Sequence, residues 1–281
     1  MSSTFLAITT ATVAQLGPTW ESMLMVVGVM VPFFMSQWEE YHTHTLRTNL
    51  AVGPFSFGVT EAQLTLVACY AATGIWGPGI WHSYPLAFLA DLGAPAPLAG
   101  ALAWLAGQKG NALLLLGYFA VPCGVALSCP FNVLADARTK GKRLAALAQL
   151  APLAAVVGLT LWAIDGEGAA FFGAHPRLVL VATALLFTDL TQRMIVASFC
   201  KMAFSLAHPG VLLLPVVAAA VRGSSAMLGD RWQALTVTRA YCGVVLVLYA
   251  HYVTNVIREI CGHLGIECFR IKAKGVQAIS R

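Results

Sequence analysis

The sequence predicts an all-α fold, a polytopic membrane helix bundle of about eight spans. Of its 281 residues, 58% are hydrophobic and only 10% are charged, whereas about a quarter of the residues in an ordinary soluble domain are charged. Apolar runs recur along the chain, and no soluble domain, internal repeat or low-complexity segment separates them. Because a spanning helix needs about 20 mostly apolar residues, we expect residues 1–281 to form a single membrane domain.

Eight apolar stretches are the candidate spans, and the first and the seventh are short for that role: 4–16, 22–37, 59–75, 112–134, 144–164, 178–200, 211–221 and 235–256. Glycine–proline pairs fall between several of these stretches, where turns are expected. Residues 84–105 are also apolar, but Pro85, Pro95 and Pro97 interrupt them. Because an interior proline breaks helical hydrogen bonding, we expect a loop with interfacial pieces there.

The net charge of +5 comes largely from two clusters, one in a loop (Arg138, Lys140, Lys142, Arg143) and one at the chain end (Arg270, Lys272, Lys274, Arg281). Basic loops stay on the cytoplasmic side of a membrane, so residues 257–281 are predicted to be a basic cytoplasmic tail. Four candidate spans lie between the two clusters, an even number that returns the chain to the same side. A basic patch is also typical of nucleic-acid binding, but the hydrophobic composition argues against a nucleic-acid partner.

The seven cysteines are scattered, mostly in apolar runs, and no two of them form a CxxC pair. This spacing favours small buried hydrophobic residues over a zinc or redox site.

The segment SQWEEYHTHT directly follows the apolar run MLMVVGVMVPFFM. Helical spacing would place Glu40 and His44 on one face, with Tyr41 and Thr45 beside them, and this group could bind a cation or a cationic headgroup. The alternative is an interfacial belt, in which Trp38 and Tyr41 lie at headgroup level while the acidic residues and histidines face water. Spacing alone favours the belt.

Further polar residues lie at or inside the later stretches. Thr60 is predicted to be a helix N-cap, and Glu61 a first-turn acid that complements the helix dipole. Asp189 and Arg193 stand at positions i and i+4, which predicts a structural ion pair within the bundle.

Four separated segments resemble the CDP-alcohol phosphotransferases of eukaryotic phospholipid synthesis, the cholinephosphotransferase and ethanolaminephosphotransferase group. They read TWESMLMVVGVMVPFFMSQWEEYHTHTLRTNLAVGPFSFGVTEAQL, GIWGPGIW, AHPRLVLVATALLFTDLTQRMIVASFCKM and HYVTNVIREICGHLGIECFRIKAK. In that group a W-E-E-Y-like segment ends one membrane helix, and a short loop leads to T-E at the start of the next. The resemblance covers nearly the whole chain.

The resemblance implies transfer of phosphocholine or phosphoethanolamine from CDP-choline or CDP-ethanolamine to diacylglycerol, with release of CMP. It also implies dependence on Mg²⁺ or Mn²⁺ in the complete enzyme, residence in the endoplasmic reticulum or Golgi, and a homodimer, but it does not decide between choline and ethanolamine. The candidate substrate-binding residues are those of the W-E-E-Y and T-E segments: Trp38, Glu39, Glu40, Tyr41, Thr60 and Glu61.

The chemistry of the family depends on the motif D-G-x2-A-R-x8-G-x3-D-x3-D, which is absent from this sequence. Asp165-Gly166 begins like the motif, but Ala170 stands where the arginine is required. No catalytic or metal-binding residue is therefore assigned. The opening MSSTF resembles the stretch that follows the last aspartate, which predicts an N-terminally truncated chain. The alternatives are a non-catalytic membrane subunit or a polytopic transporter.

Overall fold

The computed structural model describes residues 2–47, 50–52, 55–91, 96–136, 139–223, 231–266 and 268. Its helices are α1 (Ser2–Val13), α2 (Trp20–Thr43), α3 (Val59–Trp76), α4 (Ala96–Ala106), α5 (Gly110–Ala135), α6 (Arg143–Ala148), α7 (Ala151–Ile164), α8 (Ala169–Ala174), α9 (Pro176–Phe199), α10 (Pro209–Arg222) and α12 (Arg231–Leu264). Short 3-10 helices connect some of them: η1 (Pro78–His82), η2 (Ala87–Asp91) and η4 (Gly166–Gly168). The short strands β1 (Leu50–Val52) and β2 (Phe55–Phe57) pair antiparallel.

Five helices of the described chain are long and apolar enough to cross a membrane: α2, α5, the α6–α7 segment Arg143–Ile164, α9, and Gln233–Leu264 of α12. The helix α10 is apolar but shorter. Helices α1 and α3 occupy the two remaining stretches that the sequence marks as spans. The expected fold class, an all-α polytopic membrane protein, is therefore confirmed.

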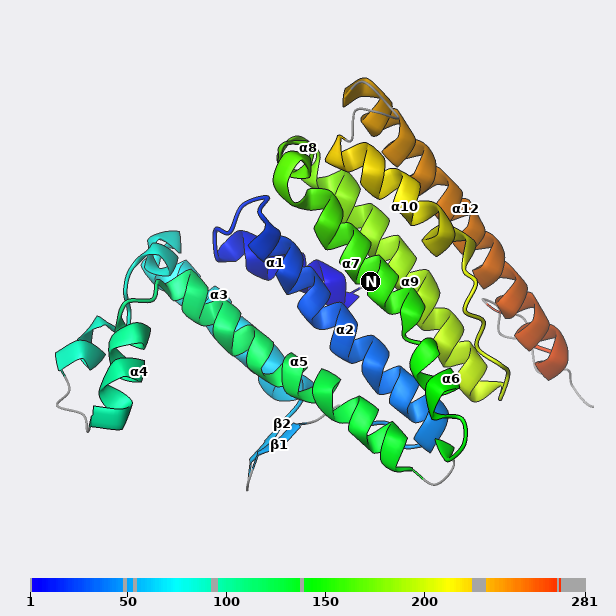
Figure 1. Cartoon of the computed structure of the whole chain (residues 1–281), viewed down its shortest axis with the longest axis horizontal. Coiled ribbons are helices and arrows are strands. Elements are labelled where there is room, and N and C mark those ends of the chain that lie inside the picture. The colour runs from blue at the N-terminus through cyan, green and yellow to red at the C-terminus, as the bar shows by residue number, and fades with distance from the viewer. Residues whose placement is uncertain are drawn as a thin grey trace, which may run out of the picture.

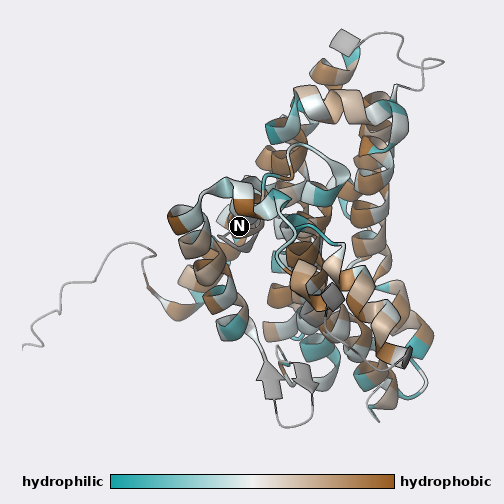
Figure 2. Ribbon diagram, turned by 90° about the vertical axis from the view of Figure 1, so that its left-hand side faces the viewer, coloured by the Kyte–Doolittle hydropathy of each residue, from teal (hydrophilic) through white to brown (hydrophobic). Residues whose placement is uncertain are grey.

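The long helices lie side by side in one bundle (Figure 1). Helix α2 packs against α5 on one side and α9 on the other, while α10 packs against both α7 and α12. Hydrophobic residues follow the lengths of these helices, and hydrophilic ones gather near their ends and in the connections (Figure 2). The start of α6 and the end of α12 lie at the same end of the bundle (Figure 1). This agrees with an even number of crossings between the two basic clusters.

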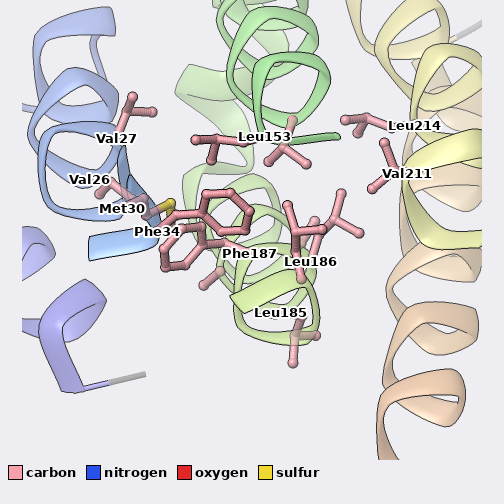
Figure 3. Packing of buried hydrophobic residues seen from close by; sticks show 14 of the residues in the cluster. Val26, Val27, Met30, Phe34, Leu153, Leu185, Leu186, Phe187, Val211 and Leu214 are labelled. Atoms are coloured by element: carbon pink, nitrogen blue, oxygen red, sulfur yellow. The ribbon is translucent and has the colours of Figure 1, made fainter. Parts of the chain in front are cut away.

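The buried core joins α2, α7, α9 and α10. Figure 3 shows the ring of Phe34 in α2 beside that of Phe187 in α9, and Leu186 on the side of α9 that faces Val211 of α10. Close approach of α2 and α5 depends on Gly28, because a Cβ atom there would lie 2.6 Å from the ring of Phe119. Small residues at such crossings let membrane helices pack at short range.

The segment predicted as a loop with interfacial pieces contains η2 and the regular helix α4. Pro97 lies in the first turn of α4. The backbone N–H groups of a first turn have no partner within the helix, so a proline there does not interrupt it. At the other end, α12 continues to Leu264, past residue 257, where the sequence placed the start of the tail. Arg138 and the basic residues from 270 onward lie outside the described residues.

Candidate functional site

The last turns of α2 carry the W-E-E-Y segment to the end of the bundle where α5 ends and α6 begins (Figure 1). The helix contains Pro32 and ends at Thr43, and His44 follows in the left-handed conformation, with φ of 54°. The backbone N–H of His44 donates to the carbonyl of Glu40 at 2.8 Å. Helix α2 therefore ends in a hydrogen-bonded C-cap at His44, close to the end of α5 and the start of α6.

Glu39 is the centre of a small polar cluster. Its side chain is 0% exposed. The Oε1 atom accepts a hydrogen bond from Nδ2 of Asn132 on α5 at 3.0 Å and lies 3.3 Å from Nη1 of Arg47. The Oε2 atom has no hydrogen-bond partner among the residues that the structure describes, although the thiol of Cys129 on α5 lies near the carboxylate. Buried carboxylate oxygens in proteins are nearly always hydrogen-bonded or paired with a charge. The Oε2 atom of Glu39 is therefore a position where a donor or a cation would be favourable.

The residues around Glu39 fasten α2 to two further elements. The indole Nε1 of Trp38 donates to the carbonyl of Ala146 in α6 at 3.1 Å. The hydroxyl of Tyr41 donates to the carbonyl of Met202 at 3.0 Å and accepts from the backbone N–H of Phe204 at 3.4 Å. The W-E-E-Y segment therefore positions α5, α6 and the connection between α9 and α10 around one helix end.

The interfacial-belt interpretation is wrong for Trp38 and Glu39, because both side chains are fully buried. Neighbouring helices bury these two side chains, and the spacing of residues on one helix does not reveal such contacts. Glu40 is half-buried, and its side chain makes no hydrogen bond or ion pair within the described part of the chain. His44 is exposed.

Glu40 and His44, which were expected on one face of a helix, do not both lie in the helix. Helix α2 stops at Thr43, and a residue in the left-handed conformation leaves the helical register. His42 instead approaches Oε1 of Gln149 through its Nε2 atom at 2.9 Å.

Thr60 and Glu61 lie at the start of α3 and are both exposed. The helix begins at Val59 with Gly58 as its N-cap, so the prediction that Thr60 is the N-cap is wrong. Glu61 is in the first turn, as expected, and its Oε2 atom accepts the N–H of Gly58 at 2.8 Å. No hydrogen bond of the described residues joins this pair to the Glu39 cluster.

Sequence reasoning missed Asn132 and Arg47, which supply the partners of Glu39. A usable signal existed for Asn132, because a lone amide at the end of a long apolar run is itself a marker of a polar contact. Arg47 had no comparable signal, since it lies in a short loop. The predicted ion pair of Asp189 and Arg193 is confirmed, with Nε of the arginine 2.9 Å from Oδ1.

The described residues do not fit a divalent metal. Mg²⁺ requires octahedral oxygen coordination and is usually bound by one or two carboxylates plus substrate phosphates and water. Two carboxylates are buried among the described residues, Glu39 and Asp189, and each is already paired with an arginine. No group of three histidine, cysteine, aspartate or glutamate side chains in the described ranges is placed to bind a metal.

None of the known family models matches the chain, but individual curated proteins do. Choline/ethanolaminephosphotransferase 2 of Arabidopsis thaliana is 32% identical over 260 residues, which is 87% of this chain and 61% of that protein. Choline/ethanolaminephosphotransferase 1 of the same plant is 30% identical over 255 residues, with the same coverage. An uncharacterized CDP-alcohol phosphatidyltransferase class-I family protein 2 of Dictyostelium discoideum is 25% identical over 96% of this chain and 59% of its own length.

Fold and site together define a polytopic, all-α integral membrane protein with a buried acidic cluster at one end of its bundle. Its curated homologues are choline/ethanolaminephosphotransferases and CDP-alcohol phosphatidyltransferase class-I family proteins. The chain spans about three fifths of the length of the two plant relatives.

Proposed function

We propose that this chain acts in phospholipid biosynthesis, as part of an enzyme that transfers phosphocholine or phosphoethanolamine from a CDP-alcohol to diacylglycerol and releases CMP. The observation that carries the proposal is the carboxylate of Glu39, fully buried at the end of α2 with Oε2 unpaired among the described residues. The names of the matching relatives support the same reaction class.

In this proposal the headgroup cation of the CDP-alcohol binds near the end of α2. A quaternary ammonium or ammonium group would complement the charge of Glu39 and of the half-buried Glu40. Tyr41 adds a half-buried aromatic ring, which favours cations by cation–π contact. Trp38 is fully buried and hydrogen-bonded to α6, so in this proposal it positions the end of α2 and does not contact the headgroup. Thr60 and Glu61 are secondary candidates.

The proposed reaction also needs groups that the described residues do not supply. Phosphoryl transfer depends on metal ions that neutralise the diphosphate, and the family's aspartate motif is not in this sequence. We therefore assign the Mg²⁺ or Mn²⁺ of the proposed reaction to none of the described residues. A homodimer in the endoplasmic reticulum or Golgi membrane is part of the same proposal.

A chimera tests the reaction. In choline/ethanolaminephosphotransferase 2 of Arabidopsis thaliana, the region that matches this chain is replaced by residues 1–281. CMP release is then measured with CDP-choline and with CDP-ethanolamine in the presence of diacylglycerol. We expect activity with at least one CDP-alcohol from the chimera. A folded but inactive chimera contradicts the proposal, and co-purification of residues 1–281 with the intact Arabidopsis enzyme would then indicate a non-catalytic subunit.

Substitutions in the chimera test the headgroup site. A hydrogen bond or contact to a charged group contributes about 1.5–3 kcal/mol, so Glu39→Gln is expected to raise the KM for the CDP-alcohol about 10-fold or more. Glu40→Ala is expected to raise it as well, while the KM for diacylglycerol stays unchanged. The matched control is Glu167→Gln, on the exposed connection at the other end of α7. Equal KM values in all three variants and the parent would assign Glu39 a structural role only.

A further inference from the structure

A pocket with a few polar side chains lies at the connection between α9 and α10, apart from the Glu39 cluster, and the proposed reaction does not use it. Its cavity volume is about 220 Å³, and its polar lining comes from Arg193 on α9, Ser205 and His208 in the connection, and Tyr252 on α12. The remaining lining residues are mostly apolar and include Met202 and Phe204.

His208 is the main sign of a missing ligand. Its side chain is 2% exposed, yet its Nε2 atom has no hydrogen-bond partner among the residues that the structure describes. The ring packs against Phe204, with centroids 5.2 Å apart. A buried imidazole nitrogen normally has a partner, so the unpartnered Nε2 of a pocket-lining residue is consistent with a ligand atom binding there.

Arg193 supplies the hydrogen-bond donors of the pocket, beside its ion pair with Asp189. Its Nε atom donates to both carboxylate oxygens of Asp189, at 2.9 and 3.0 Å, and its guanidinium lies 4.1 Å from the centroid of the Tyr252 ring. The two terminal nitrogens have no acceptor within the described residues. Their planar N–H donors match the oxygens of a phosphate, and no carboxylate lines the pocket.

The surroundings of the pocket indicate where a phosphate would come from. Phe199, Met202 and Leu206 are large apolar side chains that are at least half exposed around the same connection. In a chain with membrane-spanning helices, we expect such residues to face lipid. Lys201 is exposed beside them and adds a cation of the kind that attracts anionic headgroups.

We infer that the pocket formed by Arg193, His208 and Tyr252 binds the phosphate group of a glycerophospholipid from the bilayer. The terminal nitrogens of Arg193 donate to the phosphate oxygens, and Nε2 of His208 donates to one of them or accepts from a headgroup hydroxyl. The acyl chains lie against the exposed apolar side chains. Because Tyr41 hydrogen-bonds Met202 and Phe204, an occupied pocket would also hold the connection against α2.

The test uses the 281-residue chain purified in detergent. Retention of phosphatidylglycerol, of diacylglycerol and of inorganic phosphate is measured by native mass spectrometry and by thermal stabilisation. We expect the phospholipid to be retained, and Arg193→Lys to weaken its binding about 10-fold, because lysine keeps the charge near Asp189 but loses the fork of donors. The matched control Arg258→Lys, on the exposed part of α12, is expected to bind like the parent.

A second variant keeps the test valid if Arg193→Lys does not fold. His208→Asn removes the group at the Nε2 position and is expected to weaken binding of the same phospholipid. Equal retention of diacylglycerol, with no effect of either variant, would overturn the inference, because binding would then be apolar only. Full competition by inorganic phosphate would also overturn it, since the ligand would then be a soluble phosphate.

Discussion

Glu39 has two carboxylate oxygens in unequal surroundings. Asn132 and Arg47 share Oε1, while Oε2 is buried without a partner among the described residues. An unsatisfied buried polar atom costs about 1–3 kcal/mol, so this carboxylate would not be maintained for stability alone. We propose that the unpartnered oxygen accepts the headgroup cation, and this is the residue-scale reason for the proposed site.

His208 gives a pH-dependent prediction at the same scale. Burial lowers the pKa of His208, and the charge of Arg193 lowers it further, while the backbone of Ser205 and the carboxylate of Asp189 act in the opposite direction. The folded protein therefore binds this proton less readily than the unfolded chain, whose histidine titrates near its ordinary value. The stabilising contribution is complete above about pH 6.5 and is lost as the pH falls below it.

Thermal unfolding of the purified chain between pH 8 and pH 5 measures this effect. We expect the parent to lose more stability than His208→Asn as the pH falls, with the difference developing below about pH 6.5. Parallel curves for the two proteins would show that His208 does not titrate differently in the folded state.

At the scale of elements, the start of α3 depends on one acidic side chain. Glu61 accepts the N–H of Gly58, which is only half of a capping box because glycine has no side chain, so Glu61→Ala should destabilise the first turn by about 1 kcal/mol. Hydrogen–deuterium exchange at residues 58–62 is expected to rise in that variant. Glu61→Gln keeps an acceptor and should exchange nearly like the parent; equal exchange in all three proteins would rule out a role for the cap.

At the scale of the whole molecule, the helix order fixes which connections share a side of the membrane. The start of α6 and the end of α12 lie at one end of the bundle, and the α7–α9 connection lies at the other (Figure 1). The substituted cysteine of Lys140→Cys and the native Cys268 are therefore expected to react with an impermeant maleimide from the same side of sealed vesicles. A cysteine at Glu167 should react only from the opposite side.

This labelling requires a chain in which the other native cysteines are replaced by alanine, because Cys123 and Cys200 are also exposed. Reaction of Lys140→Cys and Glu167→Cys from the same side would contradict the topology of the bundle.

The sequence by itself determined the membrane class, the positions of the long apolar helices and the ion pair of Asp189 with Arg193, because apolar run length and i,i+4 spacing are local properties of a chain. It could not determine the burial of Trp38 and Glu39 or the partners Asn132 and Arg47. Those depend on α5, α6 and the α9–α10 connection meeting at the end of α2. The same holds for His208, because its Nε2 atom lacks a partner among the described residues and the pocket beside it is formed with Arg193 of α9 and Tyr252 of α12. Contacts between distant segments are decided by packing, and packing exists only in the tertiary structure.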